Sequence, residues 1–535
     1  MTQTQARPKK SDSGKVPSYR IICNWDGAPL IYAGYPQTAE MLLEKTFGPI
    51  RNTQVDALFF SLGIHEATWP TKIVEMIGDS SDRKYDAVLK RNISETVREY
   101  WERGENPYAA IADHGHGLGM HVYPSIRMND QHFWTYQTIE AMLKSKGERF
   151  TKMRLDHPEW CLSEKHAPGW CATSWNMAIP EVRDFKLKFI EEACRIADWD
   201  GVELDWQRHA FHLPWGDEYR LRYTLTDLMR TMRDMTNKLG KERGRPFRLA
   251  VRVAATLESC NRIGYDIETW AKEGLCDIII GGGNSGTDPG FEVERSAELC
   301  QGRDIKLYPC WDFDGRQATD RLVKGKDWRT AWFRALAQEF HSRGASGIYV
   351  FNWHGYTDTN QALFTTMGSP VTLKGTRKCY SNVHRMIPPR GSQRDYADRD
   401  DRIYGETPVE LHRTLTGDGP TFQVPMYDDV PTAAKAGTLA GAELHIRMEH
   451  FSPGADVVSA TLDGKDLGAY TVTNKAAQDP GNPSDVDENS WLVWKLDPKL
   501  LAVGTREVQV KLVKRDERIT PPLTISHVDI WVDYK

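Results

Sequence analysis

Short runs of apolar and β-branched residues alternate with longer amphipathic segments over most of the chain. Eight of these runs favour strands: YRIICNWDG, VDALFFSLG, GLGMHVYPSIRMND, DGVELDWQRH, RLAVRVAAT, CDIIIGGGNSG, DIKLYPCWDFDG and SGIYVFNWHG. Helical patterns lie between them, such as the segment that begins with Pro180 at a favoured first helical position. Alternation of this kind predicts parallel strands joined by helices, and eight such units predict an α/β fold closed into a (β/α)8 TIM barrel.

A doubly wound open sheet is the alternative architecture for the same alternation. However, no G-x-G-x-x-G follows the first strand, and the three glycines at 281–283 lack the Lys-Ser/Thr of a phosphate loop. The barrel is therefore the favoured architecture.

The pattern changes near residue 403, where short alternating runs replace the strand–helix units. ELHIRMEHF, VVSATLDGKDLG, SWLVWKLD, EVQVKLVKR and ISHVDIWVDY follow one another with turns between them. This spacing is typical of an antiparallel β-sandwich. We therefore expect a disordered arm at residues 1–17, a catalytic barrel at 18–366, a linker or loop at 367–402 and a β-sandwich accessory domain at 403–535.

Charge and hydropathy exclude several classes of partner. The formal net charge is −5, so no basic excess exists to neutralise a nucleic-acid backbone. No apolar run is long enough to span a membrane, and MTQTQARPKKSDSGKVPSYR lacks the apolar core of a signal peptide. We expect no nucleic-acid or membrane partner, and a location that is cytoplasmic or, with a leader removed, secreted. The oligomeric state stays open.

Polar residues gather where the predicted strands end, and the active sites of TIM barrels lie at the carboxyl ends of their strands. Those that we expect to contact substrate are Asp26, Arg127, Asn129, Gln207, His209, Arg252, Asn284, Asp314, Asn352 and His354. For Arg127 and Asn129, bracing of a loop is an equal alternative to sugar binding.

The fourth strand carries the most informative chemistry. Side chains alternate along a strand, so Glu203, Asp205 and Gln207 share one face. Two carboxylates inside a barrel are costly unless they are paired, and Arg252 on the next strand offers a partner. We expect a Glu203–Arg252 ion pair, which favours a structural role for Glu203 and leaves Asp205 free for substrate.

Glycoside hydrolysis needs two carboxyl groups, one protonated and one ionised, beside the scissile bond. Asp205 supplies one of them. Asp312, at the end of the seventh strand, is the leading partner, and Asp314 and Glu66 are alternatives. The catalytic candidates are therefore Asp205, Asp312 and, despite its structural alternative, Glu203.

No ligand spacing such as H-E-x-x-H or H-x-H supports a metal site at the ends of the predicted strands. A metal held by Asp26, Asp205, His209 and Asp312 is a minor alternative. We expect no metal and no cofactor.

The barrel region resembles the family-ten-like glycosyl-hydrolase-related proteins, a broad group of TIM barrels. The matching motifs are SIRMND on the third strand, PEVR at the helix from Pro180, and DGVELDWQRH on the fourth strand, and the resemblance covers about residues 19–365. It implies the barrel fold and suggests glycoside hydrolysis. ATLDGKDLG resembles the β-sandwich modules appended to such barrels, which implies that the C-terminal region braces the barrel or shapes the cleft; carbohydrate binding of its own is the less favoured alternative.

DGVELDWQ also resembles the chitinase signature D-G-x-D-x-D-x-E, whose final Glu is the catalytic acid in that family. Here the acid position is Gln207, which carries no carboxyl proton, and the first inner Asp is replaced by Glu203. The resemblance therefore implies an acid from another strand, or a different chemistry.

The function that we expect is hydrolysis of O-glycosidic bonds in a poly- or oligosaccharide by carboxylates at the C-terminal mouth of the barrel. One alternative is a non-hydrolytic carbohydrate enzyme, a lyase or an isomerase, with His209 or His354 as its base. The other is a catalytically inactive carbohydrate-binding barrel, which Gln207 favours.

Overall fold

The computed structural model describes most of the chain outside several loops. The described residues are 14–25, 30, 34–62, 66–130, 132, 135–145, 150–167, 169–282, 287, 290–312, 326–353, 358–382, 406–411, 419–473 and 489–535. All nine cysteines carry free thiols. Among the described helices, none combines the length and the apolarity that a bilayer crossing requires.

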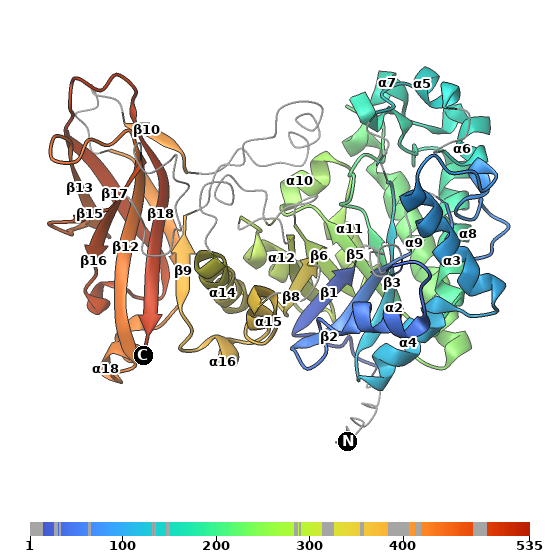
Figure 1. The fold of residues 1–535 in the computed structure, drawn as a ribbon, viewed down its shortest axis with the longest axis horizontal. Coiled ribbons are helices and arrows are strands. Elements are labelled where there is room, and N and C mark those ends of the chain that lie inside the picture. Colours follow the sequence, from blue (N-terminus) through green and yellow to red (C-terminus); the bar gives the residue numbers. More distant parts are fainter. Residues whose placement is uncertain are drawn as a thin grey trace. The chain divides into compact units, whose positions relative to one another are not determined.

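Eight parallel strands close into a barrel in the order of the chain (Figure 1). They are β1 (Ile21–Trp25), β2 (Val55–Ser61), β3 (His121–Arg127), β4 (Gly201–Asp205), β5 (Arg248–Val253), β6 (Ile278–Gly281), β7 (Lys306–Asp312) and β8 (Ile348–Phe351). β1 pairs with both β2 and β8, which closes the ring. The predicted TIM barrel is confirmed, and the open sheet is excluded.

The connections between the first seven strands contain eleven described α-helices. They are α2 (Ala39–Phe47), α3 (Val88–Glu102), α4 (Pro107–Gly117), α5 (Ile139–Lys144), α6 (Lys152–Asp156), α7 (Ser163–His166), α8 (Pro180–Arg195), α9 (Glu218–Arg243), α10 (Leu257–Arg262), α11 (Ile267–Lys272) and α12 (Val293–Cys300). The connections also contain the 3-10 turns η1 (Asp79–Ser81), η2 (Pro158–Trp160) and η3 (Gly169–Thr173).

Local sequence signals set the ends of several helices. The side chain of Asn106 caps α4 by accepting the N–H groups of Tyr108 and Ala109, and Pro107 occupies the first turn. Gly244 ends α9 with a φ of 67°, a left-handed conformation that glycine adopts without a Cβ clash. These ends fix where the chain turns back toward the next strand.

The barrel interior is packed with side chains, and its composition changes along the strands. Alternate strand positions, together with Val16 and Tyr19 from the segment before β1, form one apolar cluster. Its strand residues are Ile22, Ala57, Phe59, Tyr123, Ala250, Ile278, Ile280, Tyr308, Cys310, Tyr349 and Phe351. Buried polar side chains lie near the carboxyl ends of β1, β3, β4 and β5: Asn24, Ser125, Arg127, Glu203, Asp205 and Arg252. The fold therefore places a polar layer where barrel enzymes carry their active sites.

The chain divides into two compact units, and the barrel strands belong to the first. The second unit contains α14 (Lys326–Ser342), α15 (Asp358–Phe364), α16 (Pro370–Leu373), β9 (Lys378–Ser381) and the C-terminal strands. β9 lies in the stretch expected to be a linker or loop, and it pairs antiparallel with the last strand.

The C-terminal strands form the predicted antiparallel sandwich. One sheet has the order β10 (Val409–Leu411), β18 (Leu523–Tyr534), β12 (Leu439–Glu449), β16 (Asn489–Lys495) and β15 (Thr471–Thr473), with β9 on β18. The other has the order β11 (Thr421–Met426), β17 (Gly504–Lys514), β13 (Val457–Leu462) and β14 (Lys465–Asp466). Helix α18 (Val430–Lys435) and the turn η4 (Pro498–Leu500) complete this unit. Alternating apolar positions such as Val458, Ala460 and Leu462 of β13 form the core between the sheets.

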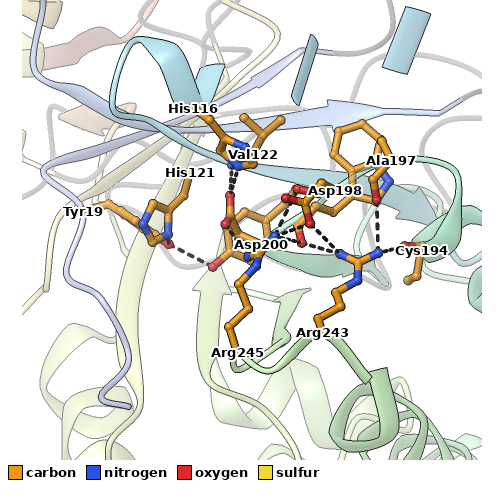
Figure 2. Close-up of polar contacts among 12 residues, drawn as sticks. Tyr19, His116, His121, Val122, Cys194, Ala197, Asp198, Asp200, Arg243 and Arg245 are labelled. Atoms are coloured by element: carbon orange, nitrogen blue, oxygen red, sulfur yellow. Dashed lines mark hydrogen bonds and ion pairs between the residues drawn. The ribbon is translucent and has the colours of Figure 1, made fainter. Parts of the chain in front are cut away.

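A polar network ties the amino-terminal ends of β3 and β4 to the ends of nearby helices (Figure 2). Asp200, directly before β4, accepts hydrogen bonds from His116 Nε2 at 2.9 Å, from the Val122 N–H at 2.7 Å and from Arg245 Nη1 at 2.7 Å. Burial alone raises the pKa of Asp200, but the bonds from His116 and Val122 outweigh it and hold the pKa below its usual value. The same contact with Asp200 raises the pKa of His116.

Two further contacts complete this end of the barrel. Arg243 donates to the carbonyl oxygens of Cys194, Ala197 and Trp199, which closes the end of α8. The phenol of Tyr19 lies 2.7 Å from His121 Nδ1. Because these groups satisfy one another at the end opposite the expected active site, we assign them to stability.

We predict that Asp200→Asn lowers the free energy of unfolding by about 3 kcal/mol, because it leaves two partly buried cationic side chains and a backbone N–H without their charged acceptor. Urea denaturation at pH 7 measures the loss. The matched control is Asp198→Asn, whose side chain is 63% exposed although it also contacts Arg245. Equal losses in the two variants would contradict a special role for Asp200.

The loss caused by Asp200→Asn also depends on pH. The depressed pKa of Asp200 gives stability that is present above the usual Asp value and lost as the pH falls. The raised pKa of His116 gives stability that is present below the usual His value and lost as the pH rises through its folded value. The difference between wild type and variant should therefore be largest between about pH 4 and 6.5 and smaller on both sides.

Candidate active site

The strand register sets two polar levels inside the barrel. Glu203 lies level with Ala250 of β5, whereas Asp205, two residues nearer the carboxyl end, lies level with Arg252. Inward side chains at one level of a barrel form a layer and contact one another. The two carboxyl groups of β4 therefore have different neighbours.

Glu203 is enclosed by donors from the barrel interior. The Tyr349 hydroxyl donates to Oε1 at 2.7 Å, and Asn24 Nδ2 donates to Oε2 at 3.1 Å. Burial raises the pKa of Glu203 to about 7, and the adjacent negative charge of Asp205 adds to this rise. Glu203 therefore keeps its proton up to near-neutral pH.

Asp205 forms a buried ion pair. Arg252 Nη1 donates to Asp205 Oδ1 at 2.9 Å, and both side chains are 1% exposed. The backbone N–H groups of Gln207 and Arg208 donate to the same oxygen at 3.1 and 2.9 Å. The expected Glu203–Arg252 pair was wrong, because the register places an alanine, and not the arginine, level with Glu203.

The second oxygen of Asp205 has a different environment. Oδ2 is buried and makes no hydrogen bond with any described residue. A buried carboxylate oxygen without a donor is costly, and a donor supplied by a ligand would remove that cost. The sequence predicted that Asp205 is free for substrate, but its Oδ1 is occupied by Arg252 and two backbone N–H groups, and only Oδ2 lacks a donor among the described residues.

A second polar group follows β3 and β4. Arg127 Nη1 donates to Asp130 Oδ2 at 2.7 Å, and both side chains are buried. The other oxygen, Asp130 Oδ1, bonds His132 Nδ1, and Arg208 Nη2 lies 3.4 Å from His132 Nε2. The ring of His209 lies 5.1 Å from that of His132, and burial together with the charge of Arg208 lowers the pKa of His209.

This second group contains three donor atoms that could hold a metal ion. One atom each from Asp130, His132 and His209 lies within 4.8 Å of the other two. Electrostatics oppose a cation there, because Arg127 already pairs with Asp130 and Arg208 faces His132. The cluster shares only His209 with the metal set considered from sequence.

Asn129 braces the loops around the site. Its Nδ2 donates to the carbonyl oxygens of Trp175 and Phe211, and its Oδ1 accepts the Trp175 N–H. These bonds occupy both ends of the amide. The geometry favours the bracing alternative over sugar binding for this residue.

The other predicted site residues are described only in part. Asp26, Asn284, Asp314 and His354 lie outside the described residues, and for Asp312 only the backbone, at the end of β7, is described. Gln207 is fully buried after β4. Asn352 has a φ of 59°, and its Oδ1 has no hydrogen-bond partner among the described residues. Glu66 is one of the alternatives to Asp312. Its carboxylate accepts hydrogen bonds from the Ser80 hydroxyl and the Gly78 N–H in a local turn, so both of its oxygens already have donors.

The candidate list from sequence missed Asn24, Tyr349 and His132. Asn24 and Tyr349 occupy interior positions of β1 and β8 and bond Glu203. Strand alternation, applied to every strand and not only to the fourth, would have found both. His132 follows the SIRMND motif in a loop, and no sequence signal marked it.

No protein-family model matches the sequence, and no curated protein matches it. Among solved structures, the chain is similar to a family GH18 chitinase from Chromobacterium violaceum, at 10% identity and a TM-score of 0.35, over 96% of this chain and 92% of that one. It is similar to the C-terminal domain of a putative chitinase from Desulfitobacterium hafniense DCB-2, at 13% identity and a TM-score of 0.36, over 67% of this chain and 100% of that one.

A third similar structure is a cycloisomaltooligosaccharide glucanotransferase from Paenibacillus sp., at 12% identity and a TM-score of 0.29. The match covers 95% of this chain and 57% of that one, so this chain spans little more than half the length of that enzyme. At such identities and scores these likenesses assign no activity to this chain.

We predict a strong coupling between Asp205 and Arg252 in a double-mutant cycle with Asp205→Asn and Arg252→Met. Removing one partner strands the other charge in the barrel, so each single change should cost about 3–5 kcal/mol, and the double change should cost much less than their sum. Denaturant unfolding measures the four free energies.

The control cycle uses the exposed pair Asp184 and Lys188 on α8, with Asp184→Asn and Lys188→Met. Its coupling should stay near 0.3–0.5 kcal/mol, roughly the size measured for exposed helix pairs. A coupling of that size for Asp205 and Arg252 would contradict the buried pair.

Proposed function

We propose that the chain is a carbohydrate-active barrel enzyme that hydrolyses O-glycosidic bonds of a poly- or oligosaccharide at the carboxyl ends of its strands. The observation that carries this proposal is Asp205 itself. One of its oxygens is fixed by Arg252 and two backbone N–H groups, and the other is buried without a donor among the described residues. A rigid carboxylate with one oxygen that still lacks a donor suits a group that acts on a bound sugar.

Hydrolysis requires a second carboxyl group that gives a proton to the leaving oxygen, while water adds to the anomeric carbon. Asp312 is our choice for this group. It ends β7, two residues after Cys310, and Cys310 Sγ accepts a hydrogen bond from Arg252 Nε at 3.3 Å. Asp205 then takes the part of the ionised carboxylate, as a base for water or as a nucleophile.

Glu203 fits a positioning role better than direct contact with substrate. It lies one level deeper than Asp205, has no exposed surface, and both its oxygens already have donors. While Glu203 is neutral, Asp205 alone supplies negative charge to this pair of carboxyl groups, and Arg252 balances it. Ionisation of Glu203 would place a second negative charge against Asp205.

We predict that Asp205→Asn and Asp312→Asn each lower kcat by about 100-fold or more, because each removes a carboxyl group that takes part in proton transfer or attack. Release of reducing ends from a panel of glycans measures the rate, and thermal unfolding measures the folded fraction. The control is Asp113→Asn, an exposed Asp on α4. Activity near wild type in a folded Asp205→Asn protein would remove Asp205 from the catalytic residues.

We predict that kcat/KM falls as the pH rises through about 7, where Glu203 loses its proton. Glu203→Gln cannot ionise, so this variant should stay active and should lack the alkaline decline. Glu268→Gln, an exposed change on α11, should keep the decline. Loss of activity at every pH in Glu203→Gln would instead make Glu203 the proton donor itself, and an unchanged decline would remove it from the site.

A second candidate function is an inactive carbohydrate-binding barrel. The observation in its favour is that Gln207, a residue without a carboxyl proton, is fully buried at the position of the chitinase acid. Sugar binding by calorimetry without release of reducing ends from any glycan would support it. A product that absorbs as a new double bond would instead indicate a lyase.

A further inference from the structure

We propose that Arg208, together with His132 and His209, forms a subsite at the barrel mouth for an oxyanion on the saccharide, so that the substrate class is acidic. The oxyanion is a uronate carboxylate or a sulfate ester. This inference rests on the proposed function, because it takes the ligand to be a saccharide held beside Asp205.

Within the part of the chain that the structure describes, Arg208 is a cation without an anionic partner. Its Nη2 makes a 3.4 Å contact with His132 Nε2, and its Nε is buried with no acceptor among the described residues. By contrast, the neighbouring guanidinium groups of Arg127 and Arg252 each pair with a buried carboxylate. An anion that binds from solvent would stabilise a half-buried guanidinium that, like that of Arg208, lacks an anionic partner among the described residues.

The position of Arg208 ties it to the proposed reaction centre. It follows Asp205 by three residues, and its backbone N–H donates to Asp205 Oδ1 at 2.9 Å. A ligand that reaches the open Oδ2 of Asp205 therefore lies within the reach of an arginine side chain from the same turn. The subsite and the cleavage position are thus parts of one mouth.

A hydrogen-bonded chain orients the guanidinium. Arg127 fixes Asp130, Asp130 accepts from His132 Nδ1, and this leaves His132 Nε2 to accept from Arg208 Nη2. His132 is thereby held in the tautomer that can bond Arg208. The remaining N–H groups of Arg208 form the fork that carboxylates and sulfates bind in pairs.

The charges of the cluster favour an anion. Arg127 and Asp130 cancel each other, and burial keeps His209 neutral, which leaves the positive charge of Arg208 unbalanced among the described residues. His209 is held next to Arg208 with a φ of 60°, a backbone conformation that a residue other than glycine keeps only when the surroundings impose it. Because Arg127 and Asp130 cancel, the guanidinium of Arg208 would repel a divalent cation at this place and attract an oxyanion.

Binding titrations with two matched pairs of probes test the subsite on the full chain. The first pair is oligogalacturonate and the same oligosaccharide with its carboxyl groups reduced. The second pair is a sulfated galactan oligosaccharide and its desulfated form. Wild type should bind the charged member of at least one pair about tenfold or more tightly than the neutral member, with an affinity that falls as salt rises. The pair that discriminates identifies carboxylate or sulfate as the anion.

Arg208→Gln should abolish the discrimination and leave the affinity for neutral probes unchanged. His132→Gln, which releases the guanidinium from its orienting bond, should weaken the discrimination in part. The control is Arg220→Gln, a change at an exposed arginine on α9 that pairs with Asp217, and it should change nothing. Thermal unfolding of each variant reports whether it is folded.

Equal affinity for the charged and neutral members of both pairs would overturn the inference, and so would discrimination that survives in folded Arg208→Gln. These results are separate from those that concern the proposed function. Discrimination without hydrolysis of any probe would keep the anion subsite and reject glycoside hydrolysis. Hydrolysis of neutral glycans without discrimination would support glycoside hydrolysis and reject the anion subsite.

Discussion

The pairing of Arg252 with Asp205 is the interaction on which the polar interior of the barrel depends. Two carboxyl groups on one face of β4 would repel each other in a site with almost no exposed surface. Arg252, level with Asp205, compensates one charge, and burial removes the other by keeping Glu203 protonated. Asp205 is thereby a rigid carboxylate whose Oδ2 has no partner among the described residues, and the proposed chemistry uses that oxygen.

The polar groups described at the two ends of the barrel differ in their hydrogen bonding. At the amino-terminal ends of the strands, Asp200 satisfies a histidine, a backbone amide and an arginine at once. At the carboxyl ends, Asp205 Oδ2, Asn352 Oδ1 and Arg208 Nε are buried without hydrogen-bond partners among the described residues. Buried polar groups without partners lower the stability of the folded state, and they are expected where a ligand supplies the missing hydrogen bonds. Their presence at the carboxyl ends is therefore what we expect of a ligand site.

The sequence predicted the fold well, because periodicity is a local property. All eight barrel strands and the sandwich follow from alternation and spacing that can be counted along the chain. β9 was missed, since its four residues form a strand only by pairing with β18, far away in the sequence. The site was predicted less well: alternation placed Glu203 and Asp205 together, but the partner of Arg252 depends on the register between β4 and β5, which no local pattern encodes. The cluster around His132 depends on loops from two strands and is likewise non-local.

Infrared difference spectroscopy of the carboxyl groups addresses the protonation state directly, by comparison of wild type with Glu203→Gln across a pH titration. If Arg252 pairs with Asp205 and burial keeps Glu203 protonated, wild type at pH 6 will show the carbonyl band of a protonated carboxylic acid that the variant lacks. That band will give way to carboxylate bands as the pH rises through about 7. A spectrum in which Glu203 is already ionised at pH 6 would contradict the arrangement of one neutral and one ion-paired carboxyl group.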